Sequence, residues 1–258
     1  MRLAHTDFGG EGLPIVILHA LFASAKNWAS VGRALAARGH AYALDLRNHG
    51  HSPRAASHSL RDLVADLEEW VADNLGHPPV LLGHSMGGLT VMAFALRHPE
   101  RTRALVVVDI APRAYGGSFE RELQALRLDL SHYRTRAEVD RVLAPLLPDP
   151  RVRQFFQTGI EAGPLGFRWM TNGEALEASR LLHGSEPELF AGSYAGPVLV
   201  VAGGASPYVR PEDHRLLADF FPNVRIEVIP EADHWVQASS PAAFRAAVER
   251  FLDGLPLS

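Results

Sequence analysis

A serine within a glycine-rich turn is the residue of this sequence best suited to nucleophilic chemistry. The segment Gly83-His84-Ser85-Met86-Gly87 matches the pattern G-x-S-x-G. It directly follows the apolar run Val80–Leu82 and leads into a helical pattern over Met86–Arg97. A tight strand-to-helix turn exposes the serine hydroxyl above a sheet, and small neighbours allow the backbone to make that turn. We therefore predict Ser85 as a nucleophile; the alternative is an ordinary glycine-rich turn with an incidental serine.

A histidine near the end of the chain can supply the base that a serine hydroxyl needs to lose its proton. His234 follows the apolar run Arg225–Ile229 and precedes the last helical pattern, so it should lie in a loop at the carboxyl end of a strand. Two other late histidines are less suitably placed. His183 falls in a segment without expected strands, and His214 falls within an expected helix. We therefore predict His234 as the base.

An aspartate at the end of an apolar run is the expected partner of this histidine. Asp109 follows five apolar residues, so its carboxylate should be partly buried and should need a hydrogen-bond partner. The later loop Gly203–Val209, where many α/β enzymes of this kind carry an aspartate, holds Ser206 instead. We predict Asp109 as the acid, with Ser206 hydrogen-bonded to Asp109 or to His234. The alternatives are a turn aspartate at 109 and Asp213 as the acid.

Two backbone N–H groups are expected to stabilise the oxyanion that forms when a serine attacks a carbonyl. One donor is normally the N–H of the residue after the nucleophile, which is Met86 here. The other comes from the loop after the early apolar run Ile15–Leu18. We assign it to Leu21, with Phe22 as the alternative. Each donor of this kind contributes about 3 kcal/mol to transition-state stabilisation.

Aromatic side chains near these loops are candidates for an acyl-binding pocket. Phe22, Tyr208 and Trp235 are predicted to line it, and Trp28 either joins them or belongs to the core. Aromatic residues in the middle of the chain are expected mainly to pack against one another: Phe155, Phe156, Phe167 and Trp169. The loop Arg47–His49 is expected to be held by its own hydrogen bonds rather than to bind a substrate anion.

Short apolar runs alternate with helical patterns along the chain, which indicates an α/β protein with a doubly wound, mostly parallel sheet flanked by helices. The runs lack two-residue alternation, as expected of strands buried on both faces. Strands are expected at Ile15–Leu18, Ala41–Leu46, Val80–Leu82, Ala104–Val108, Val198–Ala202 and Arg225–Ile229. Helices are expected at Trp28–Arg38, Ser59–Leu75, Met86–Arg97, Pro211–Phe221 and Pro241–Leu252. Ser59 with Asp62 predicts an N-terminal cap.

One segment interrupts this alternation and is expected to form a helical cap. Between about Pro112 and Ala195 there is no convincing buried strand, and amphipathic pieces are separated by proline and glycine. The pieces are Phe119–Leu130, Ala137–Leu147 and Gly173–Leu182. The predicted organisation is a core formed by residues 1–111 and 196–258 with a cap formed by residues 112–195.

Composition excludes several other classes of protein. A chain of 258 residues suits a single large α/β domain. The absence of cysteine excludes disulfides and thiolate chemistry, and a formal charge of −4 gives no basic surface for nucleic acid. No metal-ligand spacing and no dinucleotide fingerprint is present, so we expect no metal and no cofactor. Lacking an apolar leader or membrane-length segment, the protein is expected to be cytoplasmic, away from membranes, and a monomer or homodimer.

The motifs together resemble the α/β-hydrolase superfamily over nearly the full length, and more narrowly the YbfF-like esterases. The most specific matches are the runs Asp45-Leu46-Arg47-Asn48-His49-Gly50-His51-Ser52-Pro53 and Gly203-Gly204-Ala205-Ser206-Pro207-Tyr208-Val209. Further matches are Leu18–Ser24, Gly83–Gly88, Asp109–Pro112 and Asp233–Val236. One departure is Ala20, which stands where the family pattern has a glycine in the oxyanion loop.

This resemblance implies an eight-stranded core with a helical cap and the hydrolysis of esters or thioesters of small to medium acyl groups. It also implies that Asp109 is the acid and that Ser206 replaces the aspartate of the usual acid loop. Other functions compatible with the same site are C–C bond hydrolysis, a lyase reaction, cofactor-free perhydrolysis, and non-catalytic binding of a small ligand, because a fold does not determine its chemistry.

Overall fold

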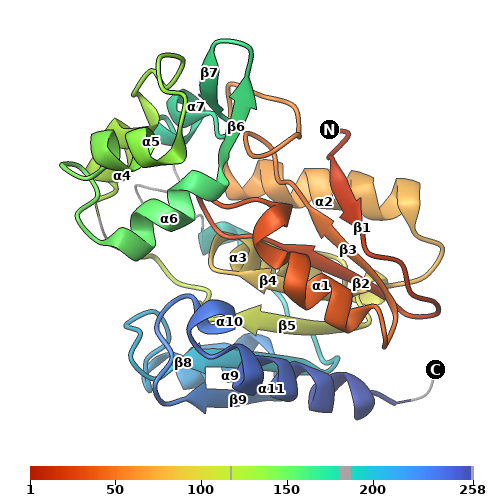
Figure 1. The fold of residues 1–258 in the computed structure, drawn as a ribbon. Coiled ribbons are helices and arrows are strands. Elements are labelled where there is room, and N and C mark those ends of the chain that lie inside the picture. The colour runs from red at the N-terminus through yellow and green to blue at the C-terminus, as the bar shows by residue number, and fades with distance from the viewer. Residues whose placement is uncertain (117, 180–186, 257–258) are drawn as a thin grey trace.

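A mostly parallel sheet of seven strands forms the centre of the computed structural model, which describes residues 1–116, 118–179 and 187–256 (Figure 1). The strand order is β1-β3-β2-β4-β5-β8-β9, and only the pairing of β1 with β3 is antiparallel. The strands are β1 His5–Asp7, β2 Pro14–Leu18, β3 His40–Leu44, β4 Val80–His84, β5 Ala104–Val108, β8 Val198–Gly203 and β9 Val224–Ile229. The predicted α/β architecture is confirmed.

The expected eighth strand is absent from the main sheet within the described residues, and that expectation is wrong. The short polar strand β1, which the sequence pattern did not predict, forms one edge of the sheet. Between β1 and β2, Gly9, Gly10 and Gly12 have φ angles of 76°, 94° and 86°. Left-handed backbone of this kind is incompatible with a strand, so this part of the chain turns instead of adding another strand.

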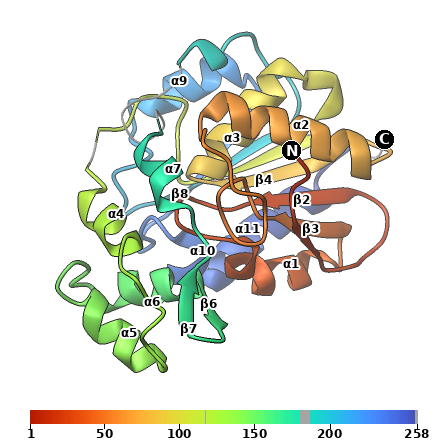
Figure 2. The ribbon, with the colours of Figure 1, turned by 90° about the horizontal axis from the view of Figure 1, so that it is seen from above.

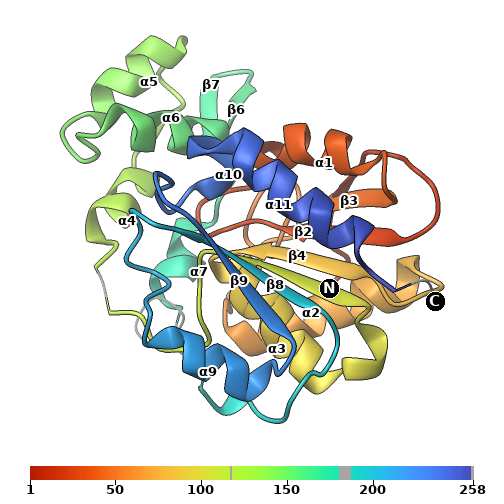
Figure 3. The same cartoon turned by 90° about the horizontal axis from the view of Figure 1, so that it is seen from below.

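Helices cover both faces of the sheet (Figures 2 and 3). One face carries α2 Leu60–Asn74, α3 Met86–Arg97 and α9 Asp213–Phe220, and the other carries α1 Ala29–Leu35, α10 Val236–Ser239 and α11 Pro241–Asp253. Alternate residues of β2 point to opposite faces of the sheet. Val16 and Leu18 pack with α2 and α3, whereas Ile15 and Ile17 pack with α1 and α11. Both faces of the strand are therefore apolar, which explains the uninterrupted apolar runs.

Several element boundaries follow from local hydrogen bonds. The predicted cap of α2 is confirmed, because Ser59 accepts from the N–H of Asp62 and the Asp62 carboxylate accepts from the N–H of Ser59. The strand β3 ends at Leu44, two residues earlier than expected, and the N–H of Leu46 donates to the His19 ring instead of to a neighbouring strand. Short 3₁₀ turns lie at Ala25–Trp28, Pro99–Arg101 and Pro187–Leu189.

Most of the chain between β5 and β8 lies beyond the carboxyl ends of the parallel strands (Figure 1), whereas its last part, including Phe190 and Tyr194, packs in the main core. The elements beyond the strand ends are α4 Glu120–Leu126, α5 Arg136–Leu143, α6 Pro150–Thr158, the antiparallel pair β6 Ile160–Gly163 and β7 Gly166–Trp169, and α7 Gly173–Glu177. They share a separate apolar cluster that includes Leu143 and Phe156. The sequence did not predict the hairpin, whose strands are short and mostly exposed. The end of the predicted piece Gly173–Leu182 lies outside the described residues.

We retain the division into a core of residues 1–111 and 196–258 and a cap of residues 112–195 as a proposal. It is supported by the separate apolar cluster of the inserted segment and by the absence of a main-sheet strand from its described part. Among the helices of the described ranges, none has both the length and the hydropathy needed to cross a membrane.

Candidate active site

The turn between β4 and α3 holds Ser85 in a left-handed backbone conformation, with φ 51° and ψ −115°. Such a conformation is uncommon for a residue with a side chain and marks a sharp change of chain direction. The N–H of Ser85 donates to the carbonyl of Val108 on the next strand, with an N–O distance of 3.1 Å. A Cβ atom at Gly83 would lie 2.2 Å from the carbonyl oxygen of Gly87. The glycines of the motif therefore allow a turn that other residues would obstruct.

The sheet topology brings this turn beside the loop that follows β2. The chain passes from β2 to β3 on one side of β2, and β4 then pairs on the other side. The carboxyl ends of β2 and β4 thus adjoin at the point where the strand order reverses, which is the usual ligand site of open α/β sheets. A Cβ atom at Gly87 would lie 2.5 Å from the carbonyl oxygen of Leu18, so the start of α3 lies against the end of β2.

Asp109 and His234 are joined by a hydrogen bond of 2.8 Å between Oδ2 of the carboxylate and Nδ1 of the imidazole. The carboxylate of Asp109 is completely buried at the end of β5, where its backbone has a φ of 47°. Its other oxygen, Oδ1, accepts from the N–H of Gly203 at 2.9 Å. Ser206 donates its hydroxyl to Oδ2, the same oxygen that faces the imidazole. Both oxygens of the buried carboxylate therefore have hydrogen-bond partners.

The alternative residues considered from the sequence lie elsewhere. Asp213 forms an ion pair with Arg113 at 2.8 Å, and Asp233 accepts from the N–H of Trp235, so neither carboxylate is bonded to the His234 ring. His214 is exposed on α9 and does not line the cavity that contains Ser85. The remaining candidate, His183, lies outside the described residues.

Two further contacts hold the imidazole of His234 in place. The ring of Tyr208 stacks on it, with 3.8 Å between ring centroids and 17° between ring planes. His84, the residue before Ser85, is bonded through Nε2 to the backbone carbonyl of His234 at 2.8 Å. Because a carbonyl can only accept, His84 carries its proton on Nε2. The Nδ1 of His234 faces Asp109, so its Nε2 is the nitrogen left for a substrate or a nucleophile.

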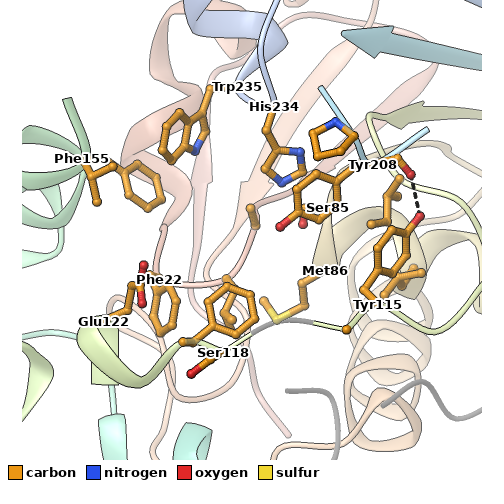
Figure 4. Close-up of a pocket in the computed structure, with 18 of the residues that line it drawn as sticks. Phe22, Ser85, Met86, Tyr115, Ser118, Glu122, Phe155, Tyr208, His234 and Trp235 are labelled. Carbon is orange, nitrogen blue, oxygen red and sulfur yellow. Dashed lines mark hydrogen bonds between the residues drawn. The ribbon is translucent and has the colours of Figure 1, made fainter. Parts of the chain in front are cut away.

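Ser85 and His234 both face one cavity of about 520 Å³. Figure 4 shows the serine and the imidazole close together, with Trp235, Phe155 and Phe22 on one side and Tyr208 and Tyr115 on the other. The wall combines residues of the sheet loops with residues of the inserted segment, and most of these are apolar. An apolar cavity with a few convergent polar groups is typical of a small-molecule site.

Two N–H groups at this cavity are available to a ligand. Leu21 and Met86 both line the cavity, and neither N–H donates to an acceptor within the described ranges. The N–H of Phe22, the alternative oxyanion donor, is directed instead at Nε2 of His49, 3.3 Å away. Ala20 has no left-handed φ, whereas Phe22 has a φ of 64°. A methyl group therefore fits at position 20 without backbone strain.

The predicted pocket residues fall into two groups. Phe22, Tyr208 and Trp235 line the cavity. Trp28 does not, and its assignment to the pocket is wrong: the side chain is 1% exposed and packs against Phe244 and His84 on the α1 face of the sheet. Of the central aromatics, Phe155 and Phe156 line the cavity, whereas Phe167 and Trp169 do not.

Several lining residues were missed by sequence reasoning because they come from segments that are far apart along the chain. They are Leu60, Leu89, Ile110, Arg113, Tyr115, Ser118, Phe119, Glu122, Val152, Pro207 and Arg210. A signal was available for a few of them, since Ile110 directly follows Asp109 and Pro207 directly follows Ser206. In the parts of the chain that the structure describes, no group of three or more His, Cys, Asp or Glu side chains is arranged so that it could hold a metal ion.

Four buried histidines surround the site and have lowered pKa values. Burial lowers the pKa of His19 to about 4 and that of His49 to about 3, and burial also lowers the pKa of His58 and of His84. The cause is that a low-dielectric interior disfavours the charged imidazolium. These rings are therefore neutral near pH 7, and each can accept a hydrogen bond on one nitrogen.

Lowering the pH should destabilise the protein, because the four buried histidines bind protons less readily in the folded state than in the unfolded state. In the unfolded chain these histidines have a pKa near 6.5. Below this pH the unfolded state binds more protons than the folded state, so the free energy of unfolding falls as the pH is lowered from about 6.5 towards 4. Thermal melts across this range should show a Tm that drops by several degrees. The proton uptake on unfolding should shrink in His49→Gln, which removes a buried histidine whose pKa is lowered in the folded state. A Tm that is constant from about pH 7 to pH 4.5 would contradict this.

Comparison with known proteins places these features in a family context. The model of the alpha/beta hydrolase fold matches residues 14–241. The chain is 34% identical to the sn-1-specific diacylglycerol lipase ABHD11 of Mus musculus, over 95% of this chain and 82% of that protein. It is 31% identical to esterase YbfF of Escherichia coli (strain K12), over 93% of each chain.

Solved structures show the same relationship. A marine microorganism esterase superposes with a TM-score of 0.88 at 31% sequence identity, covering 97% of this chain and 99% of that one. An E-2-(acetamidomethylene)succinate hydrolase superposes with a TM-score of 0.80 at 23% identity, which shows a shared fold.

Proposed function

The chain belongs to the α/β-hydrolase family, and from this premise we propose that it is a serine esterase that uses Ser85, His234 and Asp109 as its catalytic residues. The assignment of these three residues rests on one observation. Ser85 lies on a left-handed turn and faces the same cavity as His234, whose Nδ1 is bonded to a buried carboxylate. This is the arrangement of nucleophile, base and orienting acid that activates a serine hydroxyl.

Acylation begins when the Ser85 hydroxyl attacks the ester carbonyl and His234 takes its proton on Nε2. The tetrahedral oxyanion is stabilised by the N–H groups of Leu21 and Met86. The carboxylate of Asp109 holds the proton of the imidazole on Nδ1 and stabilises the imidazolium that forms. When the intermediate collapses, the C–O or C–S bond to the leaving group breaks, and His234 returns its proton to the departing alcohol or thiol.

Deacylation repeats the same steps with water as the nucleophile. His234 removes a proton from a water molecule, which attacks the acyl-serine carbonyl, and the same two N–H groups receive the second oxyanion. Collapse releases the carboxylic acid and returns the proton to Ser85. These steps use only groups of the chain and water. Ser206, bonded to Asp109, acts as a positioning residue for the acid.

The cavity suits small to medium acyl groups, as esters or as thioesters. Its volume is about 520 Å³, and its aromatic side is formed by Phe22, Phe155 and Trp235. Relatives named as an esterase and as a diacylglycerol lipase support ester substrates over the other reactions considered, namely C–C hydrolysis, a lyase reaction and perhydrolysis. They also favour an enzyme over a ligand-binding protein. A cytoplasmic location and a monomeric or dimeric state stay predictions.

A panel of p-nitrophenyl esters and coenzyme A thioesters of increasing acyl length tests this proposal. We expect hydrolysis with a maximum at short to medium chains, and covalent labelling of Ser85 by a fluorophosphonate probe located by mass spectrometry. Absence of labelling together with absence of turnover across the panel would favour a binding protein. Labelling without ester turnover would favour one of the other reactions on the same site.

Ester hydrolysis should lose activity in acid because His234 must be neutral to accept a proton. We expect kcat/KM for an uncharged ester to fall as the medium becomes more acidic, because a protonated base cannot accept the proton of Ser85. Burial lowers the pKa values of His19 and His49 to about 4 and about 3, so these two rings stay neutral near pH 6 and should not contribute to the loss there. A profile that stays flat as the pH is lowered from about 8 to about 5 would argue against a histidine base.

A further inference from the structure

The motif that follows β3 takes no direct part in the proposed acylation and deacylation. It contains Arg47, Asn48 and His49, and none of these lines the cavity. Several of its bonds attach the motif to neighbouring segments: Arg47 forms a two-point ion pair with Asp66 of α2 at 2.6 and 2.8 Å, and Asn48 donates to the carbonyl of Ser57. His49 is completely buried. A buried imidazole needs hydrogen-bond partners, and one of the two partners of His49 lies in the oxyanion loop.

The oxyanion loop has a strained turn at its centre. The N–H of Ala23 donates to the carbonyl of Ala20 at 3.2 Å, so Leu21 and Phe22 are the two central residues of a β-turn. Phe22 has a φ of 64°, the left-handed value that the third residue of a type II turn requires and that glycine usually supplies. Rotation of the Leu21–Phe22 peptide towards a type I turn would relieve this strain and shift Leu21. Some contact must therefore hold that peptide in place.

His49 provides that contact. The N–H of Phe22, which belongs to the central peptide of the turn, donates to Nε2 of His49 at 3.3 Å. Nδ1 of His49 donates to the carbonyl of Arg47 at 2.9 Å, which fixes the tautomer and leaves Nε2 free to accept. The rings of His19 and His58 lie 5.0 and 5.4 Å away between centroids and confine the imidazole. His19 also contacts the loop, through Nδ1 and the carbonyl of Ala20 at 2.8 Å.

We propose that His49 is a positioning residue for the oxyanion hole: it holds the Leu21–Phe22 peptide in its strained orientation and so keeps the backbone of Leu21, whose N–H belongs to the adjoining peptide, in place at the cavity. This inference rests on the proposed function, because the N–H of Leu21 matters only if an oxyanion forms. Since the oxyanion is present in the transition state and not in the substrate, loss of its donor lowers kcat and leaves KM nearly unchanged.

Two substitutions separate this role from general packing. His49→Leu keeps the approximate volume and removes the acceptor, whereas His49→Gln retains an oxygen that can accept from the N–H of Phe22. We expect His49→Leu to lower kcat by about 10- to 100-fold, less than complete removal of an oxyanion donor. His49→Gln should recover most of this loss. A trifluoromethyl ketone, which forms a tetrahedral adduct with the serine, should bind His49→Leu more weakly by the same factor.

The matched control is His98→Leu, which removes a largely buried histidine that packs against Phe94, away from the cavity. It should lower the Tm without changing kcat. A second measurement needs no turnover: amide hydrogen exchange of Phe22 should be slow in the wild type and in His49→Gln, and fast in His49→Leu.

Three results would each overturn the inference: a folded His49→Leu variant with wild-type kcat, equal loss of kcat in the Leu and Gln variants, or rapid exchange of the Phe22 amide in the wild type. Failure of the proposed function looks different, because the wild-type protein would then show neither ester turnover nor fluorophosphonate labelling, while the exchange experiment would still report on His49.

Discussion

Replacing Ser85 by alanine should lower kcat for ester hydrolysis by about 10⁶, the loss seen when the nucleophile of a serine hydrolase is removed. Without the hydroxyl no acyl-enzyme forms, and the remaining groups can only assist direct attack by water. The fold should tolerate the change, because alanine carries the same Cβ atom into the left-handed turn and the N–H bond to Val108 is kept. Turnover of purified protein and thermal melts measure the two effects separately.

Ser118→Ala is the matched control, since Ser118 also lines the cavity and its side chain lies apart from His234 (Figure 4). It should retain activity within a few-fold of the wild type and should still react with a fluorophosphonate probe. If Ser85→Ala is folded and hydrolyses esters at the wild-type rate, the nucleophile lies elsewhere and the proposed mechanism fails.

Replacing Asp109 by asparagine should lower kcat by as much as about 10⁴. Oδ1 of Asp109 accepts from the N–H of Gly203, and an asparagine would keep its carbonyl oxygen there. Its NH₂ group would then face Nδ1 of His234, and a donor at that place forces the proton of the ring onto Nε2. A protonated Nε2 cannot accept the proton of Ser85. The prediction is checked by the kcat of a variant whose far-UV and near-UV spectra match those of the wild type.

Ser206→Ala should cost far less, because it removes one neutral donor to a carboxylate that keeps its other partners. The expected loss is about 1 kcal/mol, or about fivefold in kcat. Because Ser206 and Asp109 share the oxygen that faces His234, the double variant should be less impaired than the product of the two single effects.

Asp233→Asn is the control for the acid. Asp233 is adjacent to His234 in sequence, yet its carboxylate faces the N–H of Trp235 and the side chain of Arg151. It should retain nearly full activity. A large loss in this variant with none in Asp109→Asn would reverse the assignment of the acid.

The sequence by itself determined the order of elements and the class of fold. Parallel strands buried on both faces must be apolar throughout, so β2, β4, β5 and β8 were visible as short unbroken runs. The turn at Ser85 was equally visible, because a strand, a glycine-flanked serine and a helix occur in succession. These features depend on residues that are close together in the sequence, so they can be recognised without knowing which strands are neighbours in the sheet. The short, exposed edge strand β1 has no such pattern and was missed.

Only the tertiary structure decided what surrounds Ser85, because that depends on contacts between residues far apart along the chain. Trp28 and Trp235 are equally apolar in the sequence, yet one packs under the sheet and the other lines the cavity. The bond between Asp109 and His234 spans 125 residues and requires the carboxyl ends of β5 and β9, which flank β8 in the sheet, to lie close together. The role of His49 is the clearest case: its bond to Phe22 joins two loops that follow neighbouring strands, and it depends on a left-handed φ that no side-chain pattern encodes.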